Sequence, residues 1–260
     1  MVDGSSFGGL PAGLPAGRLI VPDLDFADDM WAGTPVLWVS DEIVPDAGER
    51  WERLYVAHPE TGLYPLLLEG LRSDADRPWR VGELSPVAEG AIDALTAEGV
   101  LRRFWSDVTD EDDEDVPPYE DWPGLAGAGV RVAEPGDAAR EHAELWAKDG
   151  VLLGLVPAAR GADALSLAGW GGPLNHTNFT QEISAVVRSW EDRFGVRVVR
   201  VGFDTLDLSV AAPPVTIEQA RHITAEHYAF CPDNIWQGGA GFEEYAADLV
   251  DADHWSFWWD

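Results

Sequence analysis

Apolar runs and amphipathic stretches alternate along the first part of the chain. Residues 34–41 and 62–71 are short apolar runs bounded by turn-forming residues, which predicts two strands, although Pro65 weakens the second. Between them, large apolar side chains recur at helical spacing over 46–60, and a proline near the end of this stretch is expected to stop the helix. The same spacing over 85–105 predicts a further helix.

The second half of the chain has a clearer pattern of the same kind. It predicts a strand at 150–158, helices at 179–195, 216–231 and 241–250, a strand or hairpin at 196–210 and an aromatic strand at 254–260. The helix at 216–231 opens with a capping box formed by Thr216 and Gln219. This order of elements predicts an α/β fold, with α+β as the alternative, in which a mixed sheet is flanked by amphipathic helices.

Composition divides the chain into four segments. Residues 1–17 are rich in Gly, Pro and Ala and predict a flexible N-terminus, followed by an α/β block at 18–106. Residues 107–124 form an acidic, Pro-rich run that we interpret as a linker, because like charges repel one another and keep such a run extended. Calcium binding is the alternative, but the glycine of an EF-hand loop is missing. The last segment, 125–260, predicts a C-terminal α/β domain. The pattern leaves open whether the two blocks form one domain or two.

The charge of the chain limits its partners. There are 47 acidic residues against 17 basic ones, a net charge of −30, and 13 tryptophans. Such a charge repels phosphate groups, so we expect no binding to nucleic acid or to an anionic membrane. The charge can serve solubility alone, or it can attract a basic protein partner through steering that salt weakens.

Several other classes are disfavoured by motifs that the sequence lacks. A single cysteine fits a reducing compartment, and neither a secretory signal nor a long apolar run is recognisable, so we expect a cytoplasmic protein. The only lysine, Lys148, precedes Asp149 and not Ser or Thr, which excludes a phosphate-binding P-loop. We therefore expect no cofactor.

The end of the helix at 216–231 carries the first group of candidate residues. His227 and Cys231 are four residues apart, and Asp233 follows the helix, so these three are weak candidates for a metal site. His227 and Cys231 also lie on a largely apolar stripe, and we favour the interpretation that they face the core. We therefore predict no metal site. Glu226 beside them is a candidate general base, with His227 as a candidate acid.

A second group of polar residues precedes the helix at 179–195. Asn175 and His176 lie in the glycine-rich stretch 169–178, where free backbone N–H groups and His176 could bind a small anion or a substrate carbonyl group. We favour a simpler role for this stretch, in which Asn178 or Thr180 caps the following helix. Near the end of the chain, an exposed Trp258 would indicate a protein-binding surface.

Several rare sequence elements together resemble a known family. The motifs GWGGPLN, WEDRFG, EHYAFCPDNIWQG and HWSFWWD are similar to those of the domain of unknown function 4253, over about residues 150–260. The stretch 34–71 also resembles the N-terminal region of longer members. The family has no assigned activity, so the resemblance implies a domain boundary and no catalytic residue. It also implies that several residues matter together, namely Trp170, Asn175, Glu226, His227, Cys231, Asp233 and Trp236.

Two functions from different classes remain. The first is a non-catalytic protein-binding module that acts as the acidic partner of a basic protein, in the manner of an immunity protein or antitoxin. The alternative is a small-molecule-binding protein or hydrolytic enzyme with a pocket between 169–178 and the helix end at 226–233. Its catalytic candidates are Glu226, His227 and His176, and the binding candidates of either function are Trp170, Asn175, Asp233, Trp236 and Trp258. A purely structural module is a third possibility, and the oligomeric state is not predicted.

Overall fold

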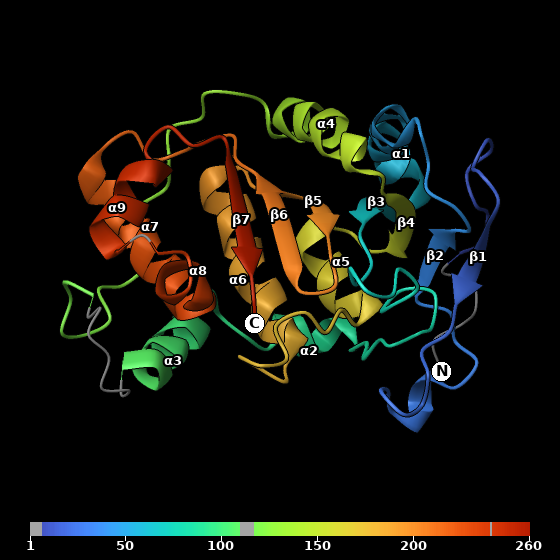
Figure 1. Ribbon diagram of the computed structural model, residues 1–260, viewed down its shortest axis with the longest axis horizontal. Helices are drawn as coiled ribbons and strands as arrows, with labels where there is room; N and C mark the ends of the chain where they lie inside the picture. The colour runs from blue at the N-terminus through green and yellow to red at the C-terminus, as the bar shows by residue number, and fades with distance from the viewer. Residues whose placement is uncertain (1–6, 110–116, 240) are drawn as a thin grey trace.

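One seven-stranded mixed sheet organises the molecule (Figure 1). This computed structural model describes residues 7–109, 117–239 and 241–260. In spatial order the strands are β1 (Gly17–Ile20), β2 (Leu37–Ser40), β4 (Leu152–Pro157), β3 (Leu63–Leu68), β5 (Arg197–Val201), β6 (Thr205–Ser209) and β7 (His254–Trp258). Neighbouring strands are antiparallel except β3 and β5, which are parallel. The predicted α/β fold with a mixed sheet is therefore confirmed.

The middle of the sheet joins the two halves of the chain. β4 lies between β2 and β3, so a strand from the C-terminal segment is hydrogen-bonded on both sides by strands from the N-terminal segment. The division into blocks at 18–106 and 125–260 stays a prediction. Of the predicted linker 107–124, residues 107–109 complete a helix and 110–116 lie outside the described residues.

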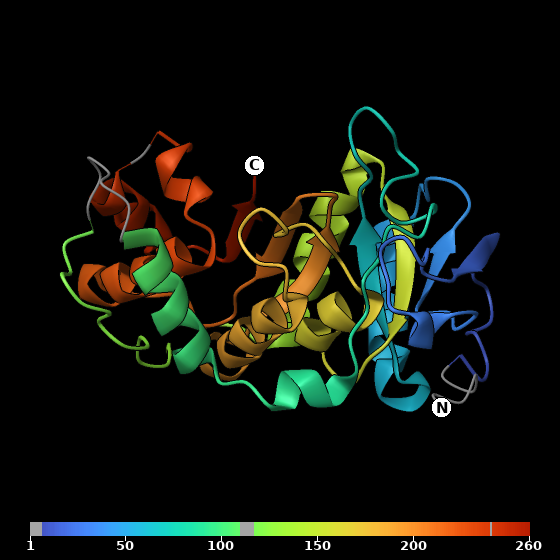
Figure 2. The same ribbon diagram turned by 90° about the horizontal axis from the view of Figure 1, so that it is seen from below.

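Helices cover both faces of the sheet. Their bounds are α1 (Ala47–Thr61), α2 (Glu89–Asp93), α3 (Ala97–Thr109), α4 (Pro135–Trp146), α5 (Gly161–Ala168), α6 (Thr180–Phe194), α7 (Ile217–Phe230), α8 (Asp233–Trp236) and α9 (Phe242–Leu249), with short 3-10 turns η1 (Asp29–Trp31) and η2 (Ala147–Asp149). α1 and α4 pack together over a small core on one face. The larger core lies on the other face, beneath α5, α6 and α7, with α3 beside α6 and α7 (Figure 2).

Two predicted helices have different bounds in the structure. α1 continues through Pro59 to Thr61 and ends at Gly62, whose φ of 67° is favourable for glycine. The helix predicted over 85–105 is two helices, α2 and α3. They separate at Thr96, whose hydroxyl accepts a hydrogen bond from the Gly99 backbone at 3.2 Å and so starts α3 as an N-cap would.

The strand β7 closes the sheet with an aromatic face. Trp255, Phe257 and Trp259 are buried, whereas Ser256 and Trp258 are exposed on the other side, as the alternation in the sequence predicts. The buried rings pack on Trp190 of α6, which stacks on Phe257 at 5.4 Å. In the described part of the chain, no helix has both the length and the apolar character needed to cross a membrane.

Candidate functional site: an acidic cleft

An acidic cleft of about 390 Å³ lies where the loop 169–178 meets α8 and the end of α3. Its walls include three carboxylates, a histidine, an asparagine and a tryptophan, from Asp107, Asn175, His176, Asp233, Trp236 and Asp260. Among the residues that the structure describes, no lysine or arginine lines this cleft. The arrangement therefore favours a positively charged ligand.

Other clefts of similar or larger size have a different character. One of about 600 Å³ is lined by Glu69, Arg72 and Arg80, so charges of both signs face it. Another of about 360 Å³ is lined mainly by apolar groups near Phe26 and Phe203. We consider the acidic cleft the candidate site because it combines one sign of charge with several residues that the sequence had singled out.

Hydrogen bonds hold the polar wall of the cleft in place. The Asp233 carboxylate accepts hydrogen bonds from the Asp260 backbone at 3.2 Å and from the Gln237 side chain at 3.1 Å. The Asn175 side-chain amide donates to the Asp260 carbonyl, which ties the loop 169–178 to the residues after β7. On the other side, the indole N–H of Trp236 donates to the Tyr228 hydroxyl at 3.2 Å and fixes the ring. The cleft is thus built before any ligand arrives.

His176 lies in the cleft wall as a neutral imidazole. Its ring packs against Phe104 of α3, with ring centres 4.5 Å apart. Burial lowers the pKa of His176 more than its hydrogen bond to the Ala229 backbone and the nearby carboxylates raise it. Its Nε2 atom is buried and has no hydrogen-bond partner in the part of the chain that the structure describes.

The predicted caps before α6 are wrong. No side chain caps the first turn of α6, whose N-cap position is Phe179, and Thr180 is already helical. Thr177 organises the turn instead: its hydroxyl accepts from the Phe179 backbone at 3.2 Å and donates to the Glu182 carboxylate at 2.7 Å. Asn178 lies outside this arrangement and borders the apolar cleft.

Glu226, the candidate general base, lies away from the acidic cleft. Its side chain is fully buried, and its carboxylate accepts hydrogen bonds from the Ala126 backbone, the Trp190 indole and both terminal nitrogens of Arg193, at 2.6–2.7 Å. A carboxylate with four such donors has no exposed lone pair with which to take a proton from a substrate. Its contacts instead connect α6, α7 and the segment around Ala126.

His227 is enclosed by aromatic rings. Its ring lies edge-on to Trp255 and Phe257, at 4.6 and 4.9 Å between ring centres, and its Nδ1 lies 3.1 Å from the Tyr245 hydroxyl. Burial, with a smaller contribution from the positive charge of Arg193, lowers the pKa of His227 to about 3. The ring is therefore neutral near pH 7 and inaccessible to solvent.

Cys231 and the remaining candidates also lie apart from the cleft. Cys231 is buried, its thiol donates to the Trp258 carbonyl at 3.0 Å, and burial raises the pKa of the thiol. Within the described residues, His227, Cys231 and Asp233 do not bring three ligand atoms within 4.8 Å of one another. Trp170 is buried and donates to the Gly202 carbonyl at 2.8 Å. Trp258 is 38% exposed and lies outside the cleft wall.

The structure thus brings together Asn175, His176, Asp233 and Trp236 and separates them from Glu226 and His227. Asp107 and Asp260 also line the cleft, and no motif in the sequence pointed to either of them. Asp260 follows the aromatic strand that the alternation predicts, but its contact with Asn175 depends on where β7 ends in the sheet. Asp107 belongs to the acidic run that we had interpreted as a linker.

The fold and the cleft define an α/β protein with a cleft lined by carboxylates. Comparison with known families then identifies the C-terminal part: residues 152–260 match the family described as Domain of unknown function (DUF4253). This finding confirms the resemblance seen in the sequence. The matched segment contains all of the cleft wall except the residues at the end of α3. No curated protein and no solved structure matches the chain.

Proposed function

We propose that the protein is a non-catalytic binding module whose acidic cleft accepts a lysine or arginine side chain of a basic protein. The observation that carries this proposal is the composition of the cleft wall, where the carboxylates of Asp107, Asp233 and Asp260 lie beside Trp236. Carboxylates form strong, charge-assisted hydrogen bonds with ammonium and guanidinium groups. An aromatic ring in the same cleft attracts the cation further through its electron-rich face.

The charge of the whole chain supports the same proposal. A net charge of −30 produces a negative potential that accelerates the approach of a basic partner. This long-range attraction acts on any cation, whereas the cleft discriminates by shape and by its fixed hydrogen bonds. The two features together suit a protein partner with a basic surface and one protruding basic side chain.

The proposal can be tested with a labelled oligolysine peptide as the probe. Asp233→Asn removes one charge from the cleft, and we expect it to weaken binding about tenfold, in the range of a lost charged hydrogen bond. Trp236→Ala should weaken binding several-fold through the lost cation–π contact. Fluorescence anisotropy at about 0.1 M salt measures the affinity of both variants for the peptide. At about 0.5 M salt, where charges are screened within roughly 4 Å, we expect the wild type to bind the peptide more weakly as well.

Asp248→Asn is the matched control, because Asp248 is an exposed acid of α9 outside the cleft wall. It makes the same change in net charge and should alter binding less than twofold. Equal losses for Asp233→Asn and Asp248→Asn would mean that the probe binds the charge of the surface and not the cleft. Pull-down from lysate with the wild type and with the double variant Asp233→Asn/Trp236→Ala then tests for a protein that depends on the cleft.

A small cationic molecule is the second candidate ligand, and the buried, unpartnered Nε2 of His176 favours it. Because this atom is buried, a small amine that enters the cleft as a whole can reach it and donate a hydrogen bond to it. For a hydrolytic reaction in the cleft, His176 would be the base, since Glu226 lies elsewhere. Melting-temperature shifts across a panel of small amines, compared between the wild type and His176→Asn, distinguish this candidate from the protein-binding function.

A further inference from the structure

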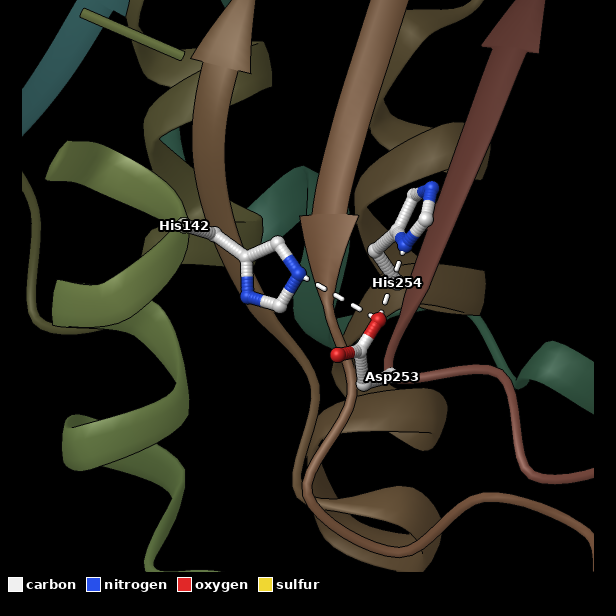
Figure 3. A group of neighbouring side chains, drawn as sticks. All are labelled: His142, Asp253 and His254. Carbon is white, nitrogen blue, oxygen red and sulfur yellow. Dashed lines mark hydrogen bonds and ion pairs between the residues drawn. The ribbon is translucent and has the colours of Figure 1, made fainter. Parts of the chain in front are cut away.

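Three potential metal ligands meet at the other end of β7 from the acidic cleft (Figure 3). His142 projects from α4, and Asp253 and His254 lie at the start of β7. His142 Nε2 lies 3.4 Å from Asp253 Oδ1, and His254 Nδ1 lies 2.9 Å from the same oxygen. Among the residues that the structure describes, this is the one group of three such side chains whose ligand atoms all lie within 4.8 Å of one another.

His142 is already oriented as a ligand. Its ring is buried against Trp146, at 4.9 Å between ring centres, and its Nδ1 lies 2.9 Å from the Ala138 carbonyl. A carbonyl oxygen only accepts hydrogen bonds, so Nδ1 carries the proton and the neutral ring has its lone pair on Nε2. This backbone contact to the second ring nitrogen is typical of histidines that bind metals, because it fixes both tautomer and orientation.

The spacing of the three ligand atoms fits a tetrahedral ion. Bonds of 2.0–2.2 Å from zinc to histidine and carboxylate ligands at tetrahedral angles place neighbouring ligand atoms about 3.4 Å apart. The distance from His142 Nε2 to Asp253 Oδ1, 3.4 Å, equals this value, whereas His254 Nδ1 lies closer, at 2.9 Å, and moves away from the oxygen when an ion enters. The side chains of Asp253 and His254 are 69% and 51% exposed, so they can adjust around the ion while the buried His142 stays in place.

We propose that His142 Nε2, His254 Nδ1 and the Asp253 carboxylate bind a divalent transition-metal ion of the zinc class. Two imidazoles and one carboxylate suit zinc, whereas magnesium and calcium prefer oxygen ligands alone. In the metal-free arrangement His254 Nδ1 faces the carboxylate and holds a proton. On binding, the ring proton resides on the other nitrogen and Nδ1 donates its lone pair to the ion. The fourth position faces solvent and takes a water molecule or a donor from a partner.

The site would join two elements that the sheet alone does not link. The ion would connect α4 to β7, the last strand of the sheet, across the face on which α4 packs. Ser209 lies opposite His254 in the β6–β7 ladder, and its buried hydroxyl has no hydrogen-bond partner in the part of the chain that the structure describes. A buried hydroxyl without a partner, opposite one of the three ligands, is a group that a water molecule or an ion at this place would satisfy.

Zinc titration of the full chain, expressed without a histidine tag and freed of metal with chelator, tests the proposal. Calorimetry in excess magnesium, which occupies acidic surface sites, should give one zinc ion per chain for the wild type. We expect His254→Ala and Asp253→Asn each to weaken zinc affinity at least tenfold, since each removes one of three ligands. Both positions are exposed, so neither change should prevent folding. Cobalt in place of zinc should give the visible absorption of a four-coordinate ion in the wild type but not in His254→Ala or Asp253→Asn.

His222→Ala serves as the matched control, because His222 is a histidine of α7 that lies outside the cluster. This variant should bind zinc as the wild type does. Added zinc should also raise the melting temperature of the wild type and of His222→Ala, and that of His254→Ala much less. The proposal is overturned if the wild type binds no zinc under these conditions, or if His254→Ala and Asp253→Asn bind it as tightly as the wild type.

Discussion

Glu226→Ala is expected to lower the free energy of unfolding by about 3–5 kcal/mol, the usual loss when one partner of a buried ion pair is removed. The change leaves Arg193 without its partner in a largely buried position, and it also leaves the Trp190 indole and the Ala126 backbone without an acceptor. Urea denaturation at pH 7, followed by circular dichroism, measures the loss. Glu226→Gln should lose less, because the amide oxygen still accepts from part of this network.

Glu243→Ala is the matched control for this prediction. Glu243 forms a two-pronged ion pair with Arg221, similar in geometry to that of Glu226 with Arg193, but both side chains are exposed. Water screens the pair and replaces the lost hydrogen bonds, so we expect a much smaller loss of stability. If the two alanine variants lost similar amounts of stability, burial would not be the reason for the role of Glu226.

Acid is expected to destabilise the fold through His227. Burial and the charge of Arg193 lower its folded pKa to about 3, against about 6.5 for an unperturbed histidine. The unfolded chain therefore takes up this proton first as the pH falls. The stabilising contribution of the neutral ring is complete above about pH 6.5 and is lost progressively as the pH falls towards 3, by about 1.4 kcal/mol per pH unit. At pH 4 the expected loss is on the order of 3 kcal/mol.

Urea denaturation at pH 7, 5.5 and 4 measures this effect as a difference between variants. Carboxylates also titrate in this range, so the comparison is between the slope of the wild type and that of His227→Asn. We expect the free energy of unfolding of His227→Asn to depend less steeply on pH. Its amide keeps a polar group near Tyr245 but has no site that takes up a proton. His222→Gln, on the exposed side of the same helix, should keep the slope of the wild type. An unchanged slope in His227→Asn would contradict the assignment.

Local patterns in the sequence predicted most elements of the fold for a simple reason. The apolar stripe of α6 and the alternation of β7 depend on residues at most a few positions apart, and each pattern has one period that fits a helix or a strand. The sequence pattern did not predict the helices α4 and α5, because small residues and glycine interrupt their apolar stripes. The predicted helix bounds at Pro59 and at Thr96 differ from the observed ones. Each observed bound depends on a single hydrogen bond or turn, and the periodicity of apolar residues carries no information about either.

The candidate residues depend on contacts between distant parts of the chain. Glu226 and His227 are adjacent to other reactive groups in the sequence, which made them candidates for an active site beside the favoured interpretation that His227 faces the core. In the fold, the hydrogen-bond donors to Glu226 belong to Ala126, Trp190 and Arg193, which lie 33 to 100 positions away, and they occupy the lone pairs of its carboxylate. His142 was not among the predicted site residues, because Asp253 and His254, which lie beside it in the fold, are more than a hundred positions further along the chain.

The sequence by itself determined the class of fold, the acidic character and the segment that resembles the family. Only the tertiary structure decided which polar groups face a cleft, which are enclosed by aromatic rings, and which meet at the start of β7. The physical reason is that secondary structure follows from interactions between near neighbours, whereas a site forms where the order of strands brings distant side chains together. In this protein that order places β4 between β2 and β3, and β7 beside β6.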